Sequence, residues 1–242
     1  MVFRKTACAL TLMFSACSIA QPAAATTILI TYTGTVTGGS DAAGLFGTPS
    51  ASLANDKFTS VYTLTYPTPG AIEKTSTPGL DEIYGGTCCY QSATSPLSGQ
   101  LTINDHTVSI NGKYAGDHKL ISPAYLSNHF NGKVSEIFDQ VSSNTGAYLY
   151  NVVYNVSGDN FISSLNFAGA LNHTVTSSDV TDGRFHFINE AGLSSYANFE
   201  NLAVSVQSIS AVPEPATWGM MIFGFGIAGV TLRARRRETA LA

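Results

Sequence analysis

The alternation of apolar and small polar residues along most of the chain constrains its fold more than any other feature. It is clearest in TILITYTGTVT (27–37), FTSVYTLTY (58–66) and AYLYNVVYNV (147–156), which are rich in Thr, Val, Ile and Tyr. Successive side chains of a β-strand point to opposite faces, so a period of two indicates strands with one buried face. The sequence therefore predicts an all-β protein.

Other segments extend this pattern to roughly seven to ten strands. Asn104-Asp105 separates two alternating runs and is a compact hairpin signal. Further strands are expected in FISSLNF (161–167), GRFHFIN (183–189) and FENLAVSVQSIS (199–210). Only SEIFDQVSS (135–143) is compatible with a short turn of helix. Clusters of Gly, Pro, Ser and Asn between the segments predict one antiparallel β-sandwich of jelly-roll type, a single domain over residues 26–210.

The composition excludes two classes of protein. The 242 residues are 44% hydrophobic and 12% charged, which is too apolar for an intrinsically disordered chain. Residues 26–212 contain six Lys or Arg and fourteen Asp or Glu, which leaves a net charge of −8. Nucleic acid requires a basic surface, so we expect no nucleic-acid partner. The remaining positive charge lies at the two ends of the chain.

The N-terminal end has the parts of an export signal: a basic start, an apolar run and small residues in an A-x-A arrangement. These parts are Arg4 and Lys5, residues 7–20, and Ala23 and Ala25. The apolar run is shorter than the roughly 20 residues that a membrane span needs. We therefore predict a signal peptide over residues 1–25, cleaved after Ala25. An uncleaved anchor and a lipid attached to Cys17 are the alternatives.

Two adjacent cysteines, Cys88 and Cys89, remain after removal of the signal peptide. Metal-binding cysteines are usually separated by two to four residues, so this pair does not indicate a zinc site. Neighbouring Cα atoms lie about 3.8 Å apart, below the usual range of about 4.4–6.8 Å for a disulfide. The pair therefore forms either a strained vicinal disulfide at a turn or two thiols that another chain can reach.

An uncharged segment of seventeen residues, Ala216–Leu232, lies near the C-terminus. As a helix it would measure about 26 Å, close to a hydrocarbon thickness of about 30 Å. Trp218 falls at one boundary, and a cluster of arginines falls at the other. The arginines are Arg233, Arg235, Arg236 and Arg237. The positive-inside rule then predicts a transmembrane helix over 216–232, with the body outside and the basic tail 233–237 inside.

A plain anchor does not explain the triplet Pro213-Glu214-Pro215, which must be extended because proline fixes its own φ and restricts the residue before it. The triplet, Trp218, the Gly-rich apolar segment and the arginine cluster together resemble the PEP-CTERM sorting signal in its PEPxxWA variant, over residues 211–237. Gly219 stands where that variant usually has Ala. The resemblance implies that an exosortase, an integral-membrane cysteine protease, recognises the signal and removes the helix.

The start of the body carries a fainter resemblance to other exported PEP-CTERM proteins, in which Y-x-G-x-V, then D-x-x-G-x-F-G, then a strand beginning F-T recur. The matching residues are Tyr32, Gly34, Val36, Asp41, Gly44, Phe46, Gly47, Phe58 and Thr59. These proteins have no assigned reaction, so the resemblance supports a class and no activity.

Neither an H-E-x-x-H, a G-x-S-x-G nor a P-loop motif occurs in the sequence. The histidines are scattered at positions 106, 118, 129, 173 and 186, so a metal site would need the fold to gather them. Asp81-Glu82 is expected in a solvated loop. Asp-containing loops at 37–44, 156–161 and 177–184 leave structural calcium open. We predict no catalytic residue, no metal and no cofactor.

These observations predict an exported, non-catalytic cell-surface or matrix protein. By the resemblance, its partners are an exosortase, the inner membrane before processing and, as an associated polymer, exopolysaccharide. An exported hydrolase and a carbohydrate-binding protein are the alternatives. Tyr148, Tyr150 and Tyr154 could stack on sugars, although their shared parity on one strand favours a position in the core.

Overall fold

The computed structural model describes residues 25–74, 78–88, 93–125, 134–209 and 225. Thirteen strands form in this part of the chain, and every pairing between them is antiparallel. They are β1 (Thr26–Asp41), β2 (Ala51–Ser52), β3 (Lys57–Tyr66), β4 (Ile72–Lys74), β5 (Leu80–Gly85), β6 (Leu97–Ile103), β7 (His106–Ile110), β8 (Ala115–Ile121), β9 (Ser135–Ser142), β10 (Tyr148–Asn155), β11 (Leu171–Thr174), β12 (Asp179–Ile188) and β13 (Ser194–Ile209).

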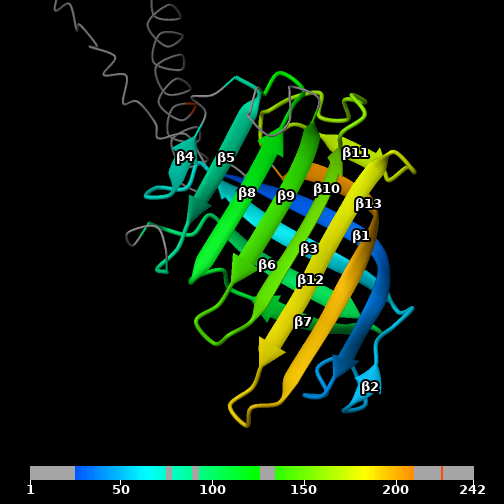
Figure 1. Ribbon diagram of the computed structural model, residues 1–242. Coiled ribbons are helices and arrows are strands. Elements are labelled where there is room, and N and C mark those ends of the chain that lie inside the picture. Colours follow the sequence, from blue (N-terminus) through cyan, green and yellow to red (C-terminus); the bar gives the residue numbers. More distant parts are fainter. Residues whose placement is uncertain (1–24, 75–77, 89–92, 126–133, 210–224, 226–242) are drawn as a thin grey trace, which may run out of the picture.

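The strands form one continuous sheet in the order β4-β5-β8-β9-β10-β12-β13-β1-β3-β6-β7, with β2 beside β1 and β11 beside β13. The sheet curls so that β5, β8, β9, β10 and β12 lie in front of β3 and β6, which cross behind them (Figure 1). No residue of the described ranges between 25 and 209 is helical. The all-β prediction is confirmed. A sandwich of two separate sheets is not shown, because β13 and β1 join the two layers.

The long strands β1 and β13 make this curl possible. Their ladder shifts register between Thr33 and Gly34 and again between Val36 and Gly38. Such bulges bend a strand and increase its twist. At Gly34 a Cβ atom would lie 2.0 Å from the carbonyl oxygen of Glu200, so only glycine fits where the two backbones approach.

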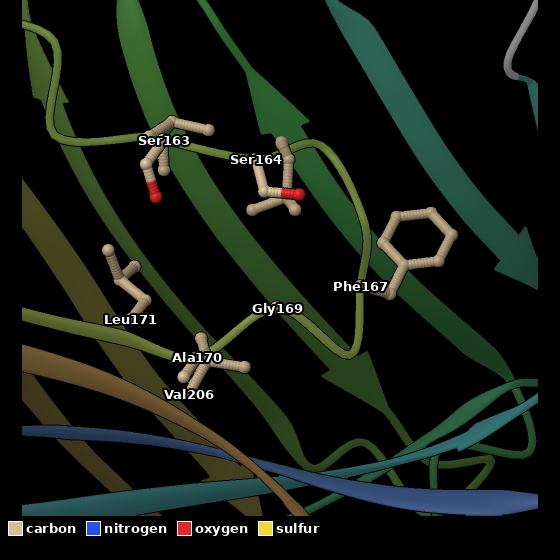
Figure 2. A pocket seen from close by; sticks show the side chains of 9 residues that line it. Ser163, Ser164, Phe167, Gly169, Ala170, Leu171 and Val206 are labelled. Atoms are coloured by element: carbon tan, nitrogen blue, oxygen red, sulfur yellow. The ribbon is translucent and has the colours of Figure 1, made fainter.

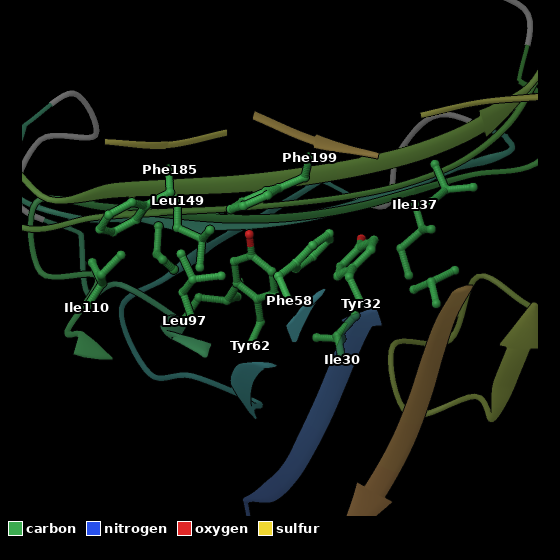
Figure 3. Packing of buried hydrophobic residues seen from close by; sticks show 14 of the residues in the cluster. Ile30, Tyr32, Phe58, Tyr62, Leu97, Ile110, Ile137, Leu149, Phe185 and Phe199 are labelled. Atoms are coloured by element: carbon green, nitrogen blue, oxygen red, sulfur yellow. The ribbon is translucent and has the colours of Figure 1, made fainter. Parts of the chain in front are cut away.

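The core lies between the two layers and is rich in aromatic rings (Figure 3). Phe58 of the rear layer stacks on Phe199 with ring centroids 4.3 Å apart. The Tyr32 and Tyr62 rings meet edge to face at 5.8 Å, a preferred geometry for aromatic pairs. Because both layers contribute side chains, neither layer can keep its apolar face buried without the other.

The residues at the start of the body that resemble other PEP-CTERM proteins stabilise a turn and the core beneath it. The buried Asp41 carboxylate accepts hydrogen bonds from the backbone N–H groups of Leu45 (2.8 Å) and Phe46 (2.7 Å) and from the Ser195 hydroxyl (2.7 Å). Gly44 provides the positive φ of +67° that this turn requires. The turn places Phe46 edge to face against Phe185, with centroids 5.3 Å apart. The motif therefore has a structural explanation.

Two predicted elements are wrong. Residues 135–142 form strand β9, and no helical turn occurs there, because Asp139 occupies a core-facing position between Ile137 and Val141 and hides the alternation. Residues 161–167 form an irregular loop between β10 and β11, although Ile162 and Phe167 are buried. The predicted hairpin is confirmed, with φ of 51° at Asn104 and 63° at Asp105 between β6 and β7.

The expected core position of the β10 tyrosines is also wrong. Tyr148, Tyr150 and Tyr154 share one face as predicted, but that face is the outer one. The core positions of β10 belong to the alternate set, Leu149, Asn151, Val153 and Asn155. Asn151 and Asn155 are polar, so the sequence pattern indicated that the set containing them would face the solvent.

Candidate functional site

The two ends of the described body lie side by side. Strand β1 begins at Thr26, directly after the predicted cleavage site, and β13 ends at Ile209, two residues before the predicted sorting signal. Thr27 and Ile209 are partners in the β1–β13 ladder. The segments that precede and follow the body therefore attach to it at one place. Cleavage after Ala25 would leave every strand complete.

Most of the predicted sorting and membrane residues lie outside the described residues. They are Pro213, Glu214, Pro215, Trp218, Arg233, Arg235, Arg236 and Arg237, together with Ala23 and the rest of residues 1–24. Ala25, the last residue before the predicted cleavage site, is described and exposed. Phe225, within the predicted span, is helical and 73% exposed. Among the described residues, no helix has the length and apolar character to cross a membrane.

Cys88 is disulfide-bonded, and its partner lies outside the described residues, as Cys89 does. The backbone N–H of Cys88 donates a hydrogen bond to the carbonyl oxygen of Tyr114 at 3.0 Å. This bond fixes the cysteine beside the start of β8. The pairing of Cys88 with Cys89 stays a prediction.

A chain of buried polar side chains connects the two layers inside the core. Tyr32 donates its hydroxyl hydrogen to Asp139 Oδ2 at 2.7 Å, and His118 Nδ1 lies 2.7 Å from Asp139 Oδ1. All three side chains are fully buried. Burial, and then the Asp139 carboxylate, raises the pKa of Tyr32 well above its ordinary value. Both carboxylate oxygens are occupied, so this group ties β1 to β8 and β9.

A second polar group lies beside the first. Tyr62 donates to Asn151 Oδ1 at 2.9 Å, and Asn151 Nδ2 donates to Asn201 Oδ1 at 2.8 Å. Asn201 Nδ2 lies 3.0 Å from the carbonyl oxygens of Val152 and Asp182, where β12 and β13 are not paired with each other. The Asn201 side chain therefore supplies hydrogen bonds where β12 and β13 do not pair, which gives this polar group a structural role.

The His118–Asp139 pair has the arrangement of a general base and the carboxylate that orients it, but both side chains are fully buried. Phe167 packs edge to face on the His118 ring, with centroids 5.2 Å apart. Beyond Phe167 is a small cavity closed by the loop before β11 (Figure 2). Its volume of about 10 Å³ has room for about one water molecule.

The adjacent acids Asp81 and Glu82 lie on strand β5, so the prediction of a solvated loop is wrong. Glu82 pairs with Lys74 on the outer face, with 3.4 Å between Oε2 and Nζ. Burial, and then Glu73, raises the pKa of Asp81 to about 6. On β8, burial and then Glu82 raise the pKa of Asp117 to about 7.

The described histidines take separate partners. His173 Nε2 lies 3.0 Å from Asp179, and His186 Nε2 lies 3.0 Å from the Ser194 hydroxyl. Within the described ranges, no three His, Cys, Asp or Glu side chains are grouped so that they could hold a metal ion. The Asp41 and Asp179 carboxylates of the calcium-like loops accept hydrogen bonds from backbone N–H groups.

Three half-buried rings on the outer surface of the front layer, Phe138, Tyr148 and Tyr150, form what we call the aromatic face. The Tyr150 centroid lies 5.6 Å from that of Tyr148 and 6.2 Å from that of Phe138. The sequence pattern favoured a core position for the tyrosines and left sugar stacking open, and it gave no prediction for Phe138. One sequence feature could have revealed this face. Asn151 and Asn155 alternate with the tyrosines of β10, and if these asparagines had been placed in the core, the tyrosines would have been predicted on the outer surface.

A groove opens next to this face, where β12 and β13 separate. The two strands pair only from Arg184–Asn198 to Ile188–Ser194. Beyond that point the groove has a volume of about 740 Å³. Its lining is mainly polar and consists of Thr37, Asp179, Val180, Thr181, Asp182, Arg184, Asn198, Phe199 and Glu200.

Comparison with known proteins identifies the C-terminal segment. A family model described as the PEP-CTERM protein-sorting motif matches residues 211–237. No curated protein and no solved structure matches the chain. The matched range coincides with the predicted sorting signal and begins two residues after β13 ends. The chain therefore carries a PEP-CTERM sorting motif, which confirms the sorting signal predicted from the sequence and supports exosortase-directed sorting of an exported protein.

Proposed function

We propose that this chain is a non-catalytic protein of the cell surface or extracellular matrix that associates with exopolysaccharide. In this proposal the signal peptide 1–25 is removed during export, and the helix 216–232 holds the chain in the inner membrane. An exosortase then cleaves near Pro213-Glu214-Pro215 and releases the body to the surface. The PEP-CTERM motif at residues 211–237 carries the proposal.

The arrangement of the two ends supports processing at both of them. Thr27 pairs with Ile209, so the export signal and the sorting signal attach to the same end of the sheet. The body can then fold while both attachments lie near the membrane. Because β1 and β13 are paired along most of their lengths, removal of both attachments leaves the central ladder of the sheet complete.

Carbohydrate binding is a second candidate function, and the aromatic face is the observation that favours it. Sugars present apolar C–H faces and polar hydroxyl groups, so they suit partly exposed rings flanked by polar side chains. The two functions are compatible, because sorting belongs to the C-terminal segment and binding would belong to the body.

The test of the sorting proposal is replacement of Pro213, Glu214 and Pro215 by Ala, Gln and Ala in the producing host. The substitution changes the extended backbone and removes the carboxylate, while the apolar span and the arginines stay. We expect uncleaved protein to accumulate in the inner membrane, measured by membrane fractionation and intact mass. Normal maturation of this variant would reduce the C-terminal segment to a simple anchor.

A matched variant replaces the four arginines Arg233, Arg235, Arg236 and Arg237 by Gln. A buried arginine costs about 2.5–3.5 kcal/mol at the centre of a membrane, so these charges hold the tail inside. We expect this change to disturb the topology of the chain as well as its cleavage. Protease accessibility of the tail separates the two effects, since the triplet change should leave topology intact.

A further inference from the structure

The aromatic face and the groove beside it form one continuous surface. Tyr150 donates its hydroxyl hydrogen to Asp182, which lines the groove. The Arg184 guanidinium lies 6.0 Å from the Tyr150 ring centroid and also lines the groove. The strands that carry the rings and one side of the groove, β9, β10 and β12, lie side by side in Figure 1.

Lys119 and Arg184, the two described cations beside these rings, each have a carboxylate partner. Lys119 Nζ lies 4.9 Å from the Phe138 ring centroid and 2.6 Å from Glu136 Oε1. Arg184 lies over Tyr150 and 3.4 Å from Asp182 Oδ2. Each cation therefore pairs with both a ring and a carboxylate. A polyanion would find no unpaired cation among these residues, and it would be repelled by a body of net charge −8.

The groove itself offers polar groups of both kinds. Asp182 and Glu200 contribute acceptors, while Thr37 and Asn198 contribute groups that can donate and accept. At about 740 Å³ the groove has the volume of a small-molecule site, yet its lining is mainly polar where such sites are mostly apolar. A ligand rich in hydroxyl groups suits this lining.

We propose that the aromatic face and the β12–β13 groove bind an uncharged polysaccharide chain. One or two sugar units would stack their C–H faces on Tyr148, Tyr150 and Phe138. The next unit would place its hydroxyl groups in the groove, against Asp182 and Asn198. The inference deepens the proposed association with exopolysaccharide and rests on it.

A protein partner fits this surface less well. The centres of protein interfaces are depleted of charged residues, whereas here Lys119, Glu136, Asp182 and Arg184 stand between and beside the rings. Their ion pairs would have to be desolvated under a protein, at a cost that exposed hydroxyl groups of a sugar largely avoid.

The test uses the full chain, purified in detergent micelles, in native gels that contain a polysaccharide. The neutral probes are galactomannan, dextran, mixed-linkage β-glucan and the neutral exopolysaccharide fraction of the producing organism, with alginate as the anionic probe. We expect at least one neutral probe to retard the protein and alginate to have no effect. Retardation by none of the neutral probes, or by alginate alone, would overturn the proposal.

Ring substitutions locate the site. Replacing Tyr148 and Tyr150 together by Ala should raise the dissociation constant about tenfold or more, since two of the three stacking rings are removed. Tyr150→Phe keeps the ring and should stay within about threefold of the native value. Ile72→Ala, a truncation of a 37% exposed side chain on the edge strand β4, is the control and should change nothing. Circular dichroism and thermal unfolding confirm that each variant is folded.

The outcomes separate this site from the wider proposal. Binding of a neutral polysaccharide that survives the double ring substitution would leave the association with polysaccharide standing and refute this site. Formation of a dimer that the double substitution abolishes, without retardation by any probe, would assign the surface to a second copy of the chain. Failure of sorting in the host does not affect the gel measurement, because that measurement uses purified unprocessed protein.

Discussion

Asp117 offers a direct test of the energetics of the sheet. Its side chain is largely buried on β8, and its Oδ1 atom has no hydrogen-bond partner within the described part of the chain. Burial and the nearby Glu82 raise its pKa to about 7 from an ordinary value of 3.8. A buried carboxylate with an unpartnered oxygen favours its neutral form. We therefore expect Asp117→Asn to stabilise the protein at alkaline pH.

The direction of the effect follows from proton binding. Between about pH 4 and pH 7 the folded state keeps a proton on Asp117 that the unfolded state has released, so ionisation destabilises the fold as the pH rises through this range. One pKa unit corresponds to about 1.4 kcal/mol, and the difference of about three units sets an upper bound of about 4 kcal/mol. Below pH 4 both states are protonated, and the variant should match the native protein.

The measurement is the free energy of unfolding in urea at pH 4, 6 and 8, followed by circular dichroism on the full chain in detergent. The stability gain of Asp117→Asn should be near zero at pH 4 and largest at pH 8. Asp159→Asn is the matched control, because Asp159 is exposed and should change the free energy by no more than about 0.5 kcal/mol. An Asp117→Asn variant that is no more stable than the native protein at pH 8 would refute the reasoning.

Two further predictions concern the close approach of β1 to β13 and the cysteine pair. Gly34→Ala should lower the free energy of unfolding by more than about 2 kcal/mol, because its Cβ would lie 2.0 Å from the Glu200 carbonyl oxygen. Gly38 has open space around it, so Gly38→Ala is the control and should change the free energy of unfolding little. Urea unfolding compares the two variants. Replacing Cys88 and Cys89 together by Ser should shift thermal unfolding by only a few degrees, since a link between neighbours closes almost no loop. Loss of folding would show that Cys88 pairs with a more distant cysteine.

The strands that the sequence predicted best are those in which apolar residues occupy nearly every core position. In β3, for example, Phe58, Tyr62 and Leu64 are buried, and Ser60 is the single small polar exception. The prediction was wrong where the core is polar. Asp139 on β9 and Asn151 on β10 face inward because partners from distant strands, Tyr32 and Tyr62, satisfy them. Those partners are 107 and 89 residues away in sequence, so no local pattern contains them.

Distance along the sequence also decides which candidate sites could be predicted from the sequence. The sorting motif is continuous in sequence, and its triplet, span and arginines are recognisable without a fold. The aromatic face is assembled from β9 and β10, and the groove adjoining it exists only because β12 leaves β13 at Arg184. A site made by the divergence of two strands has no sequence signature of its own.

The central claim is that this exported chain loses both ends and that its sorting motif is a processing signal. Intact-mass measurement of the mature protein from its native host, combined with sequencing of both termini, tests this claim most directly. We predict a chain that begins at Thr26 and ends near Pro213-Glu214-Pro215, without the apolar segment 216–232, either free or carrying an attached group. A mature protein whose mass corresponds to residues 26–242 would contradict the account and leave a protein anchored by its C-terminal segment.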